Sequence, residues 1–433
     1  MVKHQEFKQT ETGRLPKEWE VGRINKVFDV YGGTTPSTSN KEYWNGEILW
    51  VTPTDITQLN GNIYLDETEK RITDKAVKEC SLSILQNDTI LLTSRATIGF
   101  TAINAKPVTI NKGMTALIPK GKNKVYSLFY AYYFQLLKPY LEQLGAGSTF
   151  KEVSKSTIKN VYLPLLPIPE QKKIAEILST VDEAIEKVDE AIEKTQRLKK
   201  GLMQELLTRG IGHKEFKDTE TCGELGRTIG RVPQEWEVVK VKNIGEVLTG
   251  KTPSTNNKMY WNGGIPFITP VDIQETKYVY KTQRFVTQEG TQQIGYVLPK
   301  DTVLVVCIGA TIGKTAITYT ESITNQQINA IICSDKINPH YAYYAITLRN
   351  EFLKLSSGVA AVPIIKKSLF EQFKLPLPPL AEQKKIAEIL STVDNRVELL
   401  RKKKEKLERV KKGLMNDLLS GKRRVINLIS KEV

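Results

Sequence analysis

The sequence Glu-Gln-Lys-Lys-Ile-Ala-Glu-Ile-Leu-Ser-Thr-Val-Asp occurs at residues 170–182 and again, without a change, at residues 382–394. Thirteen consecutive identities do not arise by chance, so the chain contains an internal duplication. The four residues Lys-Gly-Leu-Met at 200–203 recur at 412–415 with the same separation. The 433 residues are therefore one structural unit that is present twice.

Shorter repeated motifs extend the duplication toward the N-terminal side of each long repeat. They are Glu-Trp-Glu-Val at 18–21 and 235–238, Thr-Pro-Ser-Thr at 35–38 and 252–255, Tyr-Trp-Asn-Gly at 43–46 and 260–263, and Ala-Thr-Ile-Gly at 96–99 and 310–313. Between these motifs, residues 57–92 and 274–306 share little sequence. Two copies that keep a scaffold but differ in their loops are expected when the loops recognise two different targets.

The repeats order the chain as a globular part, a long helix, a second globular part and a second long helix. We predict a first globular domain at residues 1–168, a helix at 169–209, a linker with the second globular domain at 210–380, and the second helix with a C-terminal tail at 381–433. Each globular part alternates short β-branched runs with Gly and Asn-Gly turn signals. This pattern predicts a mixed α/β domain with an irregular, largely antiparallel sheet.

The apolar positions also predict individual elements of the globular parts. Strands are expected in the first part at residues 48–51, 89–93, 116–118 and 161–163. A helix is predicted at 126–144, with a counterpart at about 340–355. Because proline lacks a backbone N–H, we expect Pro139 to kink or divide the first of these helices.

Both long helices carry an apolar seam with heptad spacing, in which successive apolar residues are four and three positions apart. The seam residues are Ile174, Leu178, Val181, Ile185, Val188 and Ile192 in the first helix, and Ile386, Leu390, Val393, Val397 and Leu400 in the second. The first helix is roughly 58 Å long at 1.5 Å per residue, which is too long for the interior of one small domain. The two seams are therefore predicted to pack on each other.

The charges of the helices predict the direction of this packing. Residues 182–193 are strongly acidic, whereas residues 396–412 are strongly basic. In a fully overlapping antiparallel pair the two stretches face each other, and complementary flanking charge selects partner and orientation in coiled coils. The alternative is that both are solvated helix faces whose charges pair elsewhere. Because residues 4–21 match the linker after the first helix, we also expect the end of the second helix near the N-terminus.

Composition excludes several classes of protein. The chain has 40% apolar residues and a net charge of +15, and its longest apolar run is far shorter than a membrane span. The N-terminus has no apolar signal region, and the four cysteines form no Cys-X-X-Cys motif, which predicts free thiols in a reducing cytoplasm. Net +8 of the charge lies in residues 396–424 alone, so basicity is weak evidence for a polyanionic partner.

No catalytic residue and no metal site is predicted. The three histidines are scattered, and methyltransferase motifs, a glycine-rich cofactor loop and a nuclease-like acidic cluster are absent from the sequence. Residues 309–315 are one residue short of a phosphate loop, and the first copy has Phe100 in place of the lysine. We interpret this segment as a turn after a strand, beside which Arg95 and Lys314 are candidate contacts to a phosphate backbone.

The candidates for ligand contact lie in two short polar loops, at 34–41 and 252–258, and in residues 147–151 before the last strand of the first part. Hydroxyl, amide and ammonium groups suit hydrogen bonds to phosphates and base edges. The candidates are Thr35, Ser37, Thr38, Asn40, Lys41, Ser148, Lys151, Thr252, Ser254, Thr255, Asn257 and Lys258. Solvated connectors are the alternative interpretation. Trp44 and Trp261 have the geometry to stack on bases, but core packing is the favoured interpretation.

These motifs together resemble a known family. The pattern is Pro-Lys-Glu-Trp-Glu-Val at 16–21, Gly-Gly-Thr-Thr-Pro-Ser followed by Tyr-Trp-Asn-Gly, and Pro-Ile-Pro-Glu-Gln-Lys-Lys-Ile-Ala at 167–175, most of it repeated. It is similar to the specificity subunit of type I restriction-modification enzymes over essentially the whole chain. The resemblance implies two target-recognition domains held apart by an antiparallel coiled coil with pseudo-two-fold symmetry, and a prokaryotic cytoplasmic location.

The resemblance also implies partners and a function. Each domain would read one half of a bipartite, asymmetric site in double-stranded DNA, and the helices would set the spacer and dock two methyltransferase subunits. Those subunits would bind S-adenosylmethionine and methylate adenine, and restriction subunits would cleave unmodified DNA with ATP and Mg. The chain itself would bind no cofactor and would not be an enzyme. One departure from the repeat is that the second copy contains about eight extra residues, around 222–229.

Two other classes of function remain open from the residues alone. One is a DNA-binding scaffold outside restriction, such as a transposition or partition factor. The other is an enzyme whose active site has no sequence motif.

Overall fold

The computed structural model forms two compact units. It describes residues 6–121, 123–146, 151–219, 221–222, 227–355 and 363–429. We call residues 1–188 with 403–433 the first unit, and residues 189–402 the second unit. Within the described ranges no helix is both long enough and apolar enough to cross a membrane.

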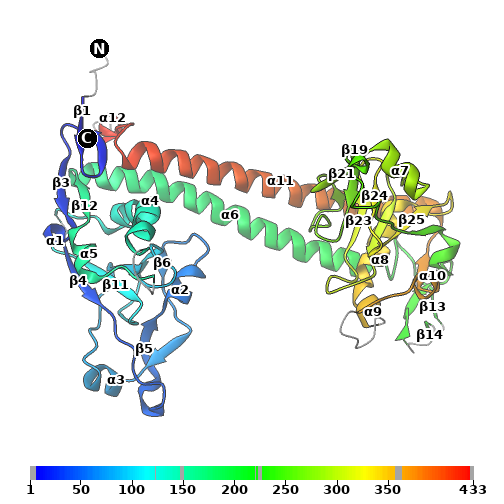
Figure 1. Cartoon of the computed structure of the whole chain (residues 1–433). Helices are drawn as coiled ribbons and strands as arrows, with labels where there is room; N and C mark the ends of the chain where they lie inside the picture. The colour runs from blue at the N-terminus through cyan, green and yellow to red at the C-terminus, as the bar shows by residue number, and fades with distance from the viewer. Residues whose placement is uncertain are drawn as a thin grey trace. The chain divides into compact units, whose positions relative to one another are not determined.

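Each unit contains one globular domain and part of both long helices, α6 (Ile168–Leu206) and α11 (Leu380–Leu419). In the first unit Lys411 of α11 pairs with Asp182 of α6, with Nζ 2.6 Å from Oδ1. In the second unit Lys199 of α6 pairs with Asp394 of α11 at 2.5 Å. In the first unit residue 170 also contacts residue 424, and in the second unit residue 382 contacts residue 211. In each unit the residue number rises along one helix as it falls along the other, so the helices are antiparallel there, as predicted (Figure 1).

Two sheets form the centre of the first globular domain. The larger has the order β4 (Phe28–Gly32), β11 (Met114–Pro119), β8 (Ile90–Thr93), β9 (Thr101–Asn104) and β6 (Tyr64–Leu65). The smaller has the order β10 (Val108–Ile110), β5 (Trp44–Val51) and β7 (Lys70–Ile72). Neighbours are antiparallel except for β6–β9 and β10–β5. Two antiparallel pairs complete the domain: β1 (Phe7–Thr10) with β2 (Gly13–Pro16), and β3 (Glu20–Arg23) with β12 (Tyr162–Leu165).

The second globular domain repeats this arrangement strand for strand. Its larger sheet has the order β18 (Gly245–Thr249), β25 (Ile328–Cys333), β22 (Val303–Val306), β23 (Thr315–Thr318) and β20 (Tyr278–Val279). Its smaller sheet has the order β21 (Arg284–Val286), β19 (Trp261–Ile268) and β24 (Ile323–Thr324), and β17 (Glu237–Lys240) pairs with β26 (Lys374–Leu377). The predicted mixed α/β class with a largely antiparallel sheet is confirmed in both copies.

The second linker forms two small hairpins. The strands are β13 (Phe216–Asp218) with β16 (Arg231–Pro233), and β14 (Thr221–Cys222) with β15 (Arg227–Thr228). The extra residues of the second copy thus include the β14–β15 pair, while residues 223–226 lie outside the described residues. Of the cysteines whose side chains are described, Cys80, Cys307 and Cys333 are free thiols.

Short helices cover the sheets. In the first domain they are α1 (Ile24–Val27), η1 (Lys41–Tyr43), α2 (Pro53–Thr57), α3 (Asp74–Glu79), α4 (Ser127–Leu144) and α5 (Lys155–Asn160). In the second domain they are η3 (Val241–Asn243), η4 (Lys258–Tyr260), α7 (Gln288–Ile294), α8 (Pro339–Leu348), α9 (Asn350–Leu355) and α10 (Lys367–Glu371), and α12 (Ile426–Ile429) follows α11.

The expectation that Pro139 divides its helix is wrong. α4 continues through Pro139 as one element. Pro139 is exposed, so water can bind the carbonyl that the missing N–H leaves free. The counterpart, which has no internal proline, is instead divided into α8 and α9 at Arg349.

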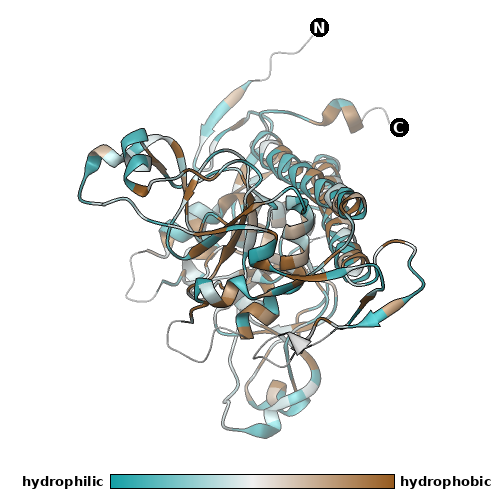
Figure 2. Cartoon of the chain, turned by 90° about the vertical axis from the view of Figure 1, so that its right-hand side faces the viewer, coloured by the Kyte–Doolittle hydropathy of each residue, from teal (hydrophilic) through white to brown (hydrophobic). Residues whose placement is uncertain are grey.

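The domain core and the helix pair share their apolar residues. In the first unit Ile174 and Leu178 of α6 belong to one cluster with Phe129 and Tyr130 of α4 and with Leu418 of α11. Among the predicted seam residues, those buried are Ile174, Leu178, Val188, Ile386, Leu390, Val397 and Leu400, and those partly buried are Val181, Ile185, Ile192 and Val393. Along both helices hydrophilic residues alternate with these apolar ones (Figure 2). The seam therefore ends inside the globular cores.

A buried carboxylate at the start of α6 joins three segments of the first unit. Glu170 is 2% exposed and accepts a hydrogen bond from the indole N–H of Trp19 at 3.0 Å. Arg424, beyond α11, donates to both its oxygens, from Nε at 2.6 Å and Nη2 at 2.9 Å. Arg424 also donates to Glu18 at 3.0 Å. The end of the second helix thus lies beside the N-terminal strands, as predicted.

The second unit contains the equivalent junction. Glu382 accepts from the indole N–H of Trp236 at 3.0 Å and from the backbone N–H of Ile211 at 2.9 Å. His213 replaces the arginine, with Nε2 2.9 Å from Oε1. A glycine in the left-handed region follows each helix. At Gly210 (φ +67°) a Cβ would lie 2.5 Å from the carboxylate of Glu382, so a larger residue does not fit there.

The glutamine that follows each carboxylate fixes the preceding loop. Gln171 is fully buried, accepts from the backbone N–H of Tyr126 at 2.8 Å and donates to the carbonyl of Leu166 at 2.8 Å. Gln383 makes the same contacts with Asn338 and Pro378, both at 2.8 Å. The Glu-Gln pair of the long repeat therefore attaches each helix to its own domain.

Replacing Glu170 with alanine is expected to lower the free energy of unfolding of the first unit by about 3–5 kcal/mol. The reason is that the guanidinium of Arg424, only 13% exposed, loses its buried acceptor. Urea denaturation followed by circular dichroism measures the loss. Glu18→Gln is the matched control, since this carboxylate contacts the same arginine but is largely exposed. Equal losses in the two variants would contradict the assignment.

Candidate nucleic-acid interface

The polar loop of the first unit has a fixed backbone conformation. Asn40 accepts the backbone N–H of Glu42 at 3.1 Å and thereby caps η1. The indole N–H of Trp44 donates to the carbonyl of Ser37 at 3.1 Å. The backbone N–H of Lys112 donates to Thr35 Oγ1 at 3.3 Å. These contacts attach the loop to the domain at three points.

The loop of the second unit repeats the first two contacts with the same types of side chain and differs in the third. Asn257 accepts the backbone N–H of Met259 at 3.1 Å and caps η4. The indole N–H of Trp261 donates to the carbonyl of Ser254 at 3.1 Å. Thr252 Oγ1 donates to Gln326 Oε1 at 2.7 Å. The backbone arrangement is therefore common to both loops, and the chemistry that each presents differs.

The side chains of the two loops divide into structural and exposed groups. Asn40 and Asn257 are partly buried and act as caps, which gives both a structural role that the sequence pattern did not identify. The exposed candidates are Thr35, Ser37, Thr38 and Lys41 in the first unit, and Thr252, Ser254, Thr255 and Lys258 in the second. These hydroxyl and ammonium groups are exposed at the surface, and their contact with DNA stays a prediction.

The repeated tryptophans pack within their domains. Trp44 meets Trp50 edge to face, with ring centroids 5.1 Å apart. Trp261 meets Phe267 in the same geometry at 5.1 Å, and the guanidinium of Arg284 lies 3.6 Å from its ring. The favoured interpretation of core packing agrees with these contacts.

The remaining candidates lie beside the turn after β8 and β22. Backbone hydrogen bonds join residue 94 to residue 113 at 2.9 Å and residue 96 to residue 151 at 3.0 Å. They bring Arg95, Lys112 and Lys151 onto neighbouring segments. Arg95 Nε lies 3.9 Å from Glu152, and Lys314 donates to the carbonyl of Ile273 at 3.2 Å. Ser148 lies outside the described residues.

The sequence pattern missed Lys112 and Gln326. They occupy equivalent places, each following an asparagine after β10 or β24 and contacting the equivalent threonine, Thr35 or Thr252. The signal was available as the repeated asparagine followed by a long polar side chain. The first unit has an ammonium where the second has an amide, so the two surfaces differ in charge at this point.

A tyrosine, an aspartate and a lysine connect each domain to both helices. In the first unit Tyr132 donates to Asp182 at 2.7 Å, and Lys411 contacts the other carboxylate oxygen. Burial and this carboxylate raise the pKa of Tyr132 well above its usual value. In the second unit Tyr344 donates to Asp394 at 2.5 Å, and Lys199 completes the cluster.

The predicted pairing of acidic and basic stretches is correct only in part. Asp182 meets Lys411 as expected. The prediction is wrong for Glu190 and Glu193, whose ion pairs are formed with Lys194 and Arg197 on the same helix. Both glutamates are exposed, and the basic residues one turn further along the same helix are within their reach.

Known proteins are similar to this chain in sequence and in fold. Residues 16–194 and 233–409 match the family described as type I restriction modification DNA specificity domain. The MjaVIII specificity subunit of Methanocaldococcus jannaschii is 29% identical over 439 residues, which cover 98% of each chain. The MjaIX specificity subunit of the same organism is 38% identical over 265 residues, which cover 61% of this chain and 60% of that relative.

Solved structures show the same fold. The S subunit of the type I restriction-modification system from M. genitalium matches 92% of this chain and 96% of its own, with a TM-score of 0.56 and 18% identity. A chain from a structure of a type I R-M system matches 94% of this chain and 98% of its own length, with a TM-score of 0.58 and 16% identity.

The contact between Tyr132 and Asp182 is expected to contribute about 1–3 kcal/mol to the stability of the first unit, because the acceptor is charged. A double-mutant cycle of Tyr132→Phe and Asp182→Asn, followed by urea denaturation, measures the coupling. Tyr344→Phe with Asp394→Asn is the matched cycle in the second unit, and we expect a similar value. Additive effects within either cycle would contradict the contact.

Proposed function

The chain belongs to the type I restriction-modification DNA specificity family, and we propose that it selects the DNA sequence on which a modification and restriction complex acts. The observation that carries this proposal is the duplication of one domain with a common backbone and different exposed side chains. A scaffold outside restriction finds no support in the relatives described above. Catalysis is assigned to partner subunits.

Each domain is proposed to read one half of a bipartite, asymmetric site in double-stranded DNA. The exposed hydroxyls of the polar loops suit hydrogen bonds to phosphates and base edges. Beside them, Lys112 in the first unit and Gln326 in the second differ in the bases that they recognise. Lys112 suits acceptors such as guanine O6 and N7, whereas Gln326 suits the donor and acceptor pair of adenine. Two different half-sites on one backbone arrangement follow from such substitutions.

The partners are proposed from the family. Two methyltransferase subunits would dock on the helix pair and bind S-adenosylmethionine, and restriction subunits would use ATP and Mg. Because the seam residues are buried or partly buried within the chain, docking would use the exposed faces of the helices. We propose further that the length of the helix pair determines the spacer between the two half-sites.

Co-expression with the methyltransferase subunit, followed by methylome sequencing, tests this function. We expect one new bipartite methylation motif. Lys112→Gln gives the first unit the residue of the second, and we expect it to alter or relax one half-site only. Gln326→Lys is the reciprocal variant and should affect the other half-site. Absence of any new methylated motif would contradict the proposed function.

Lengthening both helices by one heptad is expected to lengthen the spacer. Seven residues added after Val188 in α6 and after Lys404 in α11 add about 10 Å, which is about three base pairs of B-DNA. The half-sites should stay the same in the methylome. Insertion in α6 alone is the control, because it displaces Lys199 from Asp394 and should abolish methylation. An unchanged spacer would contradict this role of the helices.

A further inference from the structure

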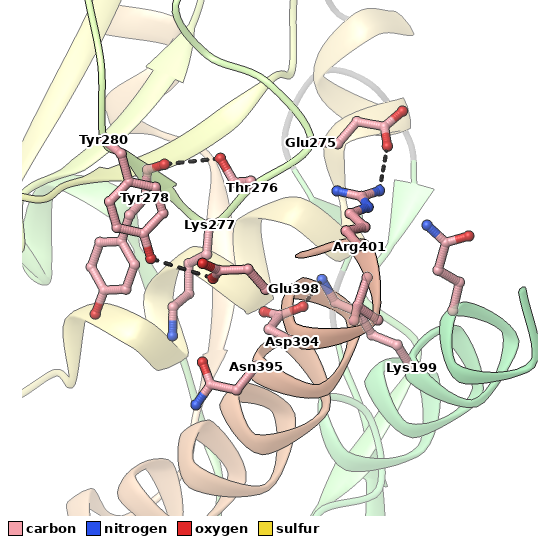
Figure 3. Close-up of a pocket in the computed structure, with 12 residues that line it drawn as sticks. Lys199, Glu275, Thr276, Lys277, Tyr278, Tyr280, Asp394, Asn395, Glu398 and Arg401 are labelled. Carbon is pink, nitrogen blue, oxygen red and sulfur yellow. Dashed lines mark hydrogen bonds and ion pairs between the residues drawn. The ribbon is translucent and has the colours of Figure 1, made fainter. Parts of the chain in front are cut away.

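A cavity of about 300 Å³ lies within the second unit between its globular domain and the helix pair (Figure 3). We call it the junction cavity. One wall is the segment that leads into β20, including Lys277 and Tyr278, and the other consists of Lys199 of α6 with Asp394 and Arg401 of α11. Two of the three basic residues are already paired, since Lys199 contacts Asp394 and Arg401 contacts Glu275 at 2.6 Å.

Among the described residues, Lys277 has no carboxylate as an ion-pair partner. Its ammonium donates to Ser391 Oγ at 2.9 Å, and no carboxylate within the described ranges forms an ion pair with it. Its Nζ lies 5.0 Å from the ring centre of Tyr278 and 5.7 Å from that of Tyr344. Burial lowers the pKa of Lys277 because the charged form loses water. The cavity wall therefore presents a partly desolvated cation to which an anion can bind.

Exposed tyrosines adjoin this cation. Tyr280 and Tyr319 are 46% and 48% exposed, and their ring centroids are 4.9 Å apart. Tyr278 lies 5.8 Å from both, and the rings of Tyr278 and Tyr280 are seen side by side in Figure 3. We call these three residues the tyrosine patch. Tyrosine and arginine beside a pocket are the residue types that carry most binding energy in protein interfaces.

The first unit keeps a tyrosine, Tyr64, at the position of Tyr278 but has other residues at the positions of Lys277, Tyr280 and Tyr319. β6 pairs with β9 in the same register as β20 with β23, because Tyr64 opposes Ile103 and Tyr278 opposes Ile317. Ile63 therefore stands in place of Lys277. Tyr280 and Tyr319 correspond to Asp66 and Ala105 in the same way.

On the helices too, residues that line the cavity are replaced by acidic residues at the equivalent repeat positions. The long repeat aligns Asn395 with Glu183 and Arg401 with Asp189. The repeat positions equivalent to the cavity lining hold one basic residue, Lys411, together with the carboxylates of Asp66, Asp182, Glu183, Glu186, Asp189 and Glu408. An anionic group that the second unit can bind is repelled at the same place in the first.

We propose that the junction cavity and the tyrosine patch form a protein-docking site, present in the second unit alone, for an acidic side chain of a methyltransferase subunit. This proposal rests on the proposed function, which supplies the partner. Lys277 is partly buried and is reached through the cavity, so a single flexible acidic side chain can approach it more closely than the phosphate backbone of a duplex can. One carboxylate inserted beside Lys277 would pair with its ammonium, and apolar surface of the same partner would cover the tyrosine patch. The two methyltransferase subunits are then bound with unequal affinity.

Titration of the full chain with its purified methyltransferase subunit, followed by native mass spectrometry and calorimetry, tests the proposal. The wild type should bind two subunits with different dissociation constants. K277I and Y280D introduce the residues that the first unit already has, so the fold should be retained. We expect the double variant to weaken the tighter constant at least tenfold and to leave the weaker one unchanged. Asp66→Ala is the matched control in the first unit and should not affect the tighter constant.

Three results would overturn the docking site. They are two equal constants in the wild type, an unchanged tighter constant in the double variant, and a selective loss of affinity for a 30-base-pair duplex, which would assign the site to DNA. In each case continued methylation of a bipartite motif by the wild type leaves the proposed function intact. If the wild type binds no methyltransferase subunit and methylates no motif, the proposed function fails, and the docking site fails with it.

Discussion

The carboxylate at the start of each long helix, buried in Glu170 and largely buried in Glu382, is the contact on which the architecture depends. Glu170 binds the N-terminal Trp19 and the C-terminal Arg424, and Glu382 binds Trp236 and His213. Each carboxylate therefore joins the beginning of a domain, the beginning of its helix and the end of the antiparallel helix. A charge without water requires all its hydrogen-bond partners, so these three segments can only assemble together. This requirement links each domain to the helix pair.

The rigidity of this junction explains why the two domains can differ so strongly in their loops. The strands, the capped polar loops and the tyrosine contacts with Asp182 and Asp394 repeat from one unit to the other. Exposed side chains such as Lys112 and Gln326 contribute little to packing and are free to change. A common backbone with exchangeable surface groups is what the recognition of two half-sites requires.

The same separation of core and surface makes the two units chemically unequal. The repeat preserves the buried contacts but replaces Lys277 by Ile63 and Arg401 by Asp189 at positions beside the helices. Lys277 and Arg401 line a cavity in the second unit, whereas Ile63 is buried in the core of the first, so the exchange replaces a charged cavity wall by apolar packing. A chain that is repeated in its fold can therefore bind its partners asymmetrically.

The sequence by itself determined the duplication, the mixed α/β class, the two long helices and their antiparallel direction. The first three follow from local periodicity and from identity between copies, and the direction follows from the complementary charges of the two helices; none of these needs knowledge of distant contacts. Only the tertiary structure decided that Glu190 and Glu193 pair within their own helix, that Asn40 is a cap, and that the helix containing Pro139 is undivided. It also decided that Lys277 faces α11, more than a hundred residues away in the chain. The physical reason is that such contacts form only when distant segments of the chain fold together. The role of a side chain then depends on which partners it meets and on how much of it stays exposed to solvent.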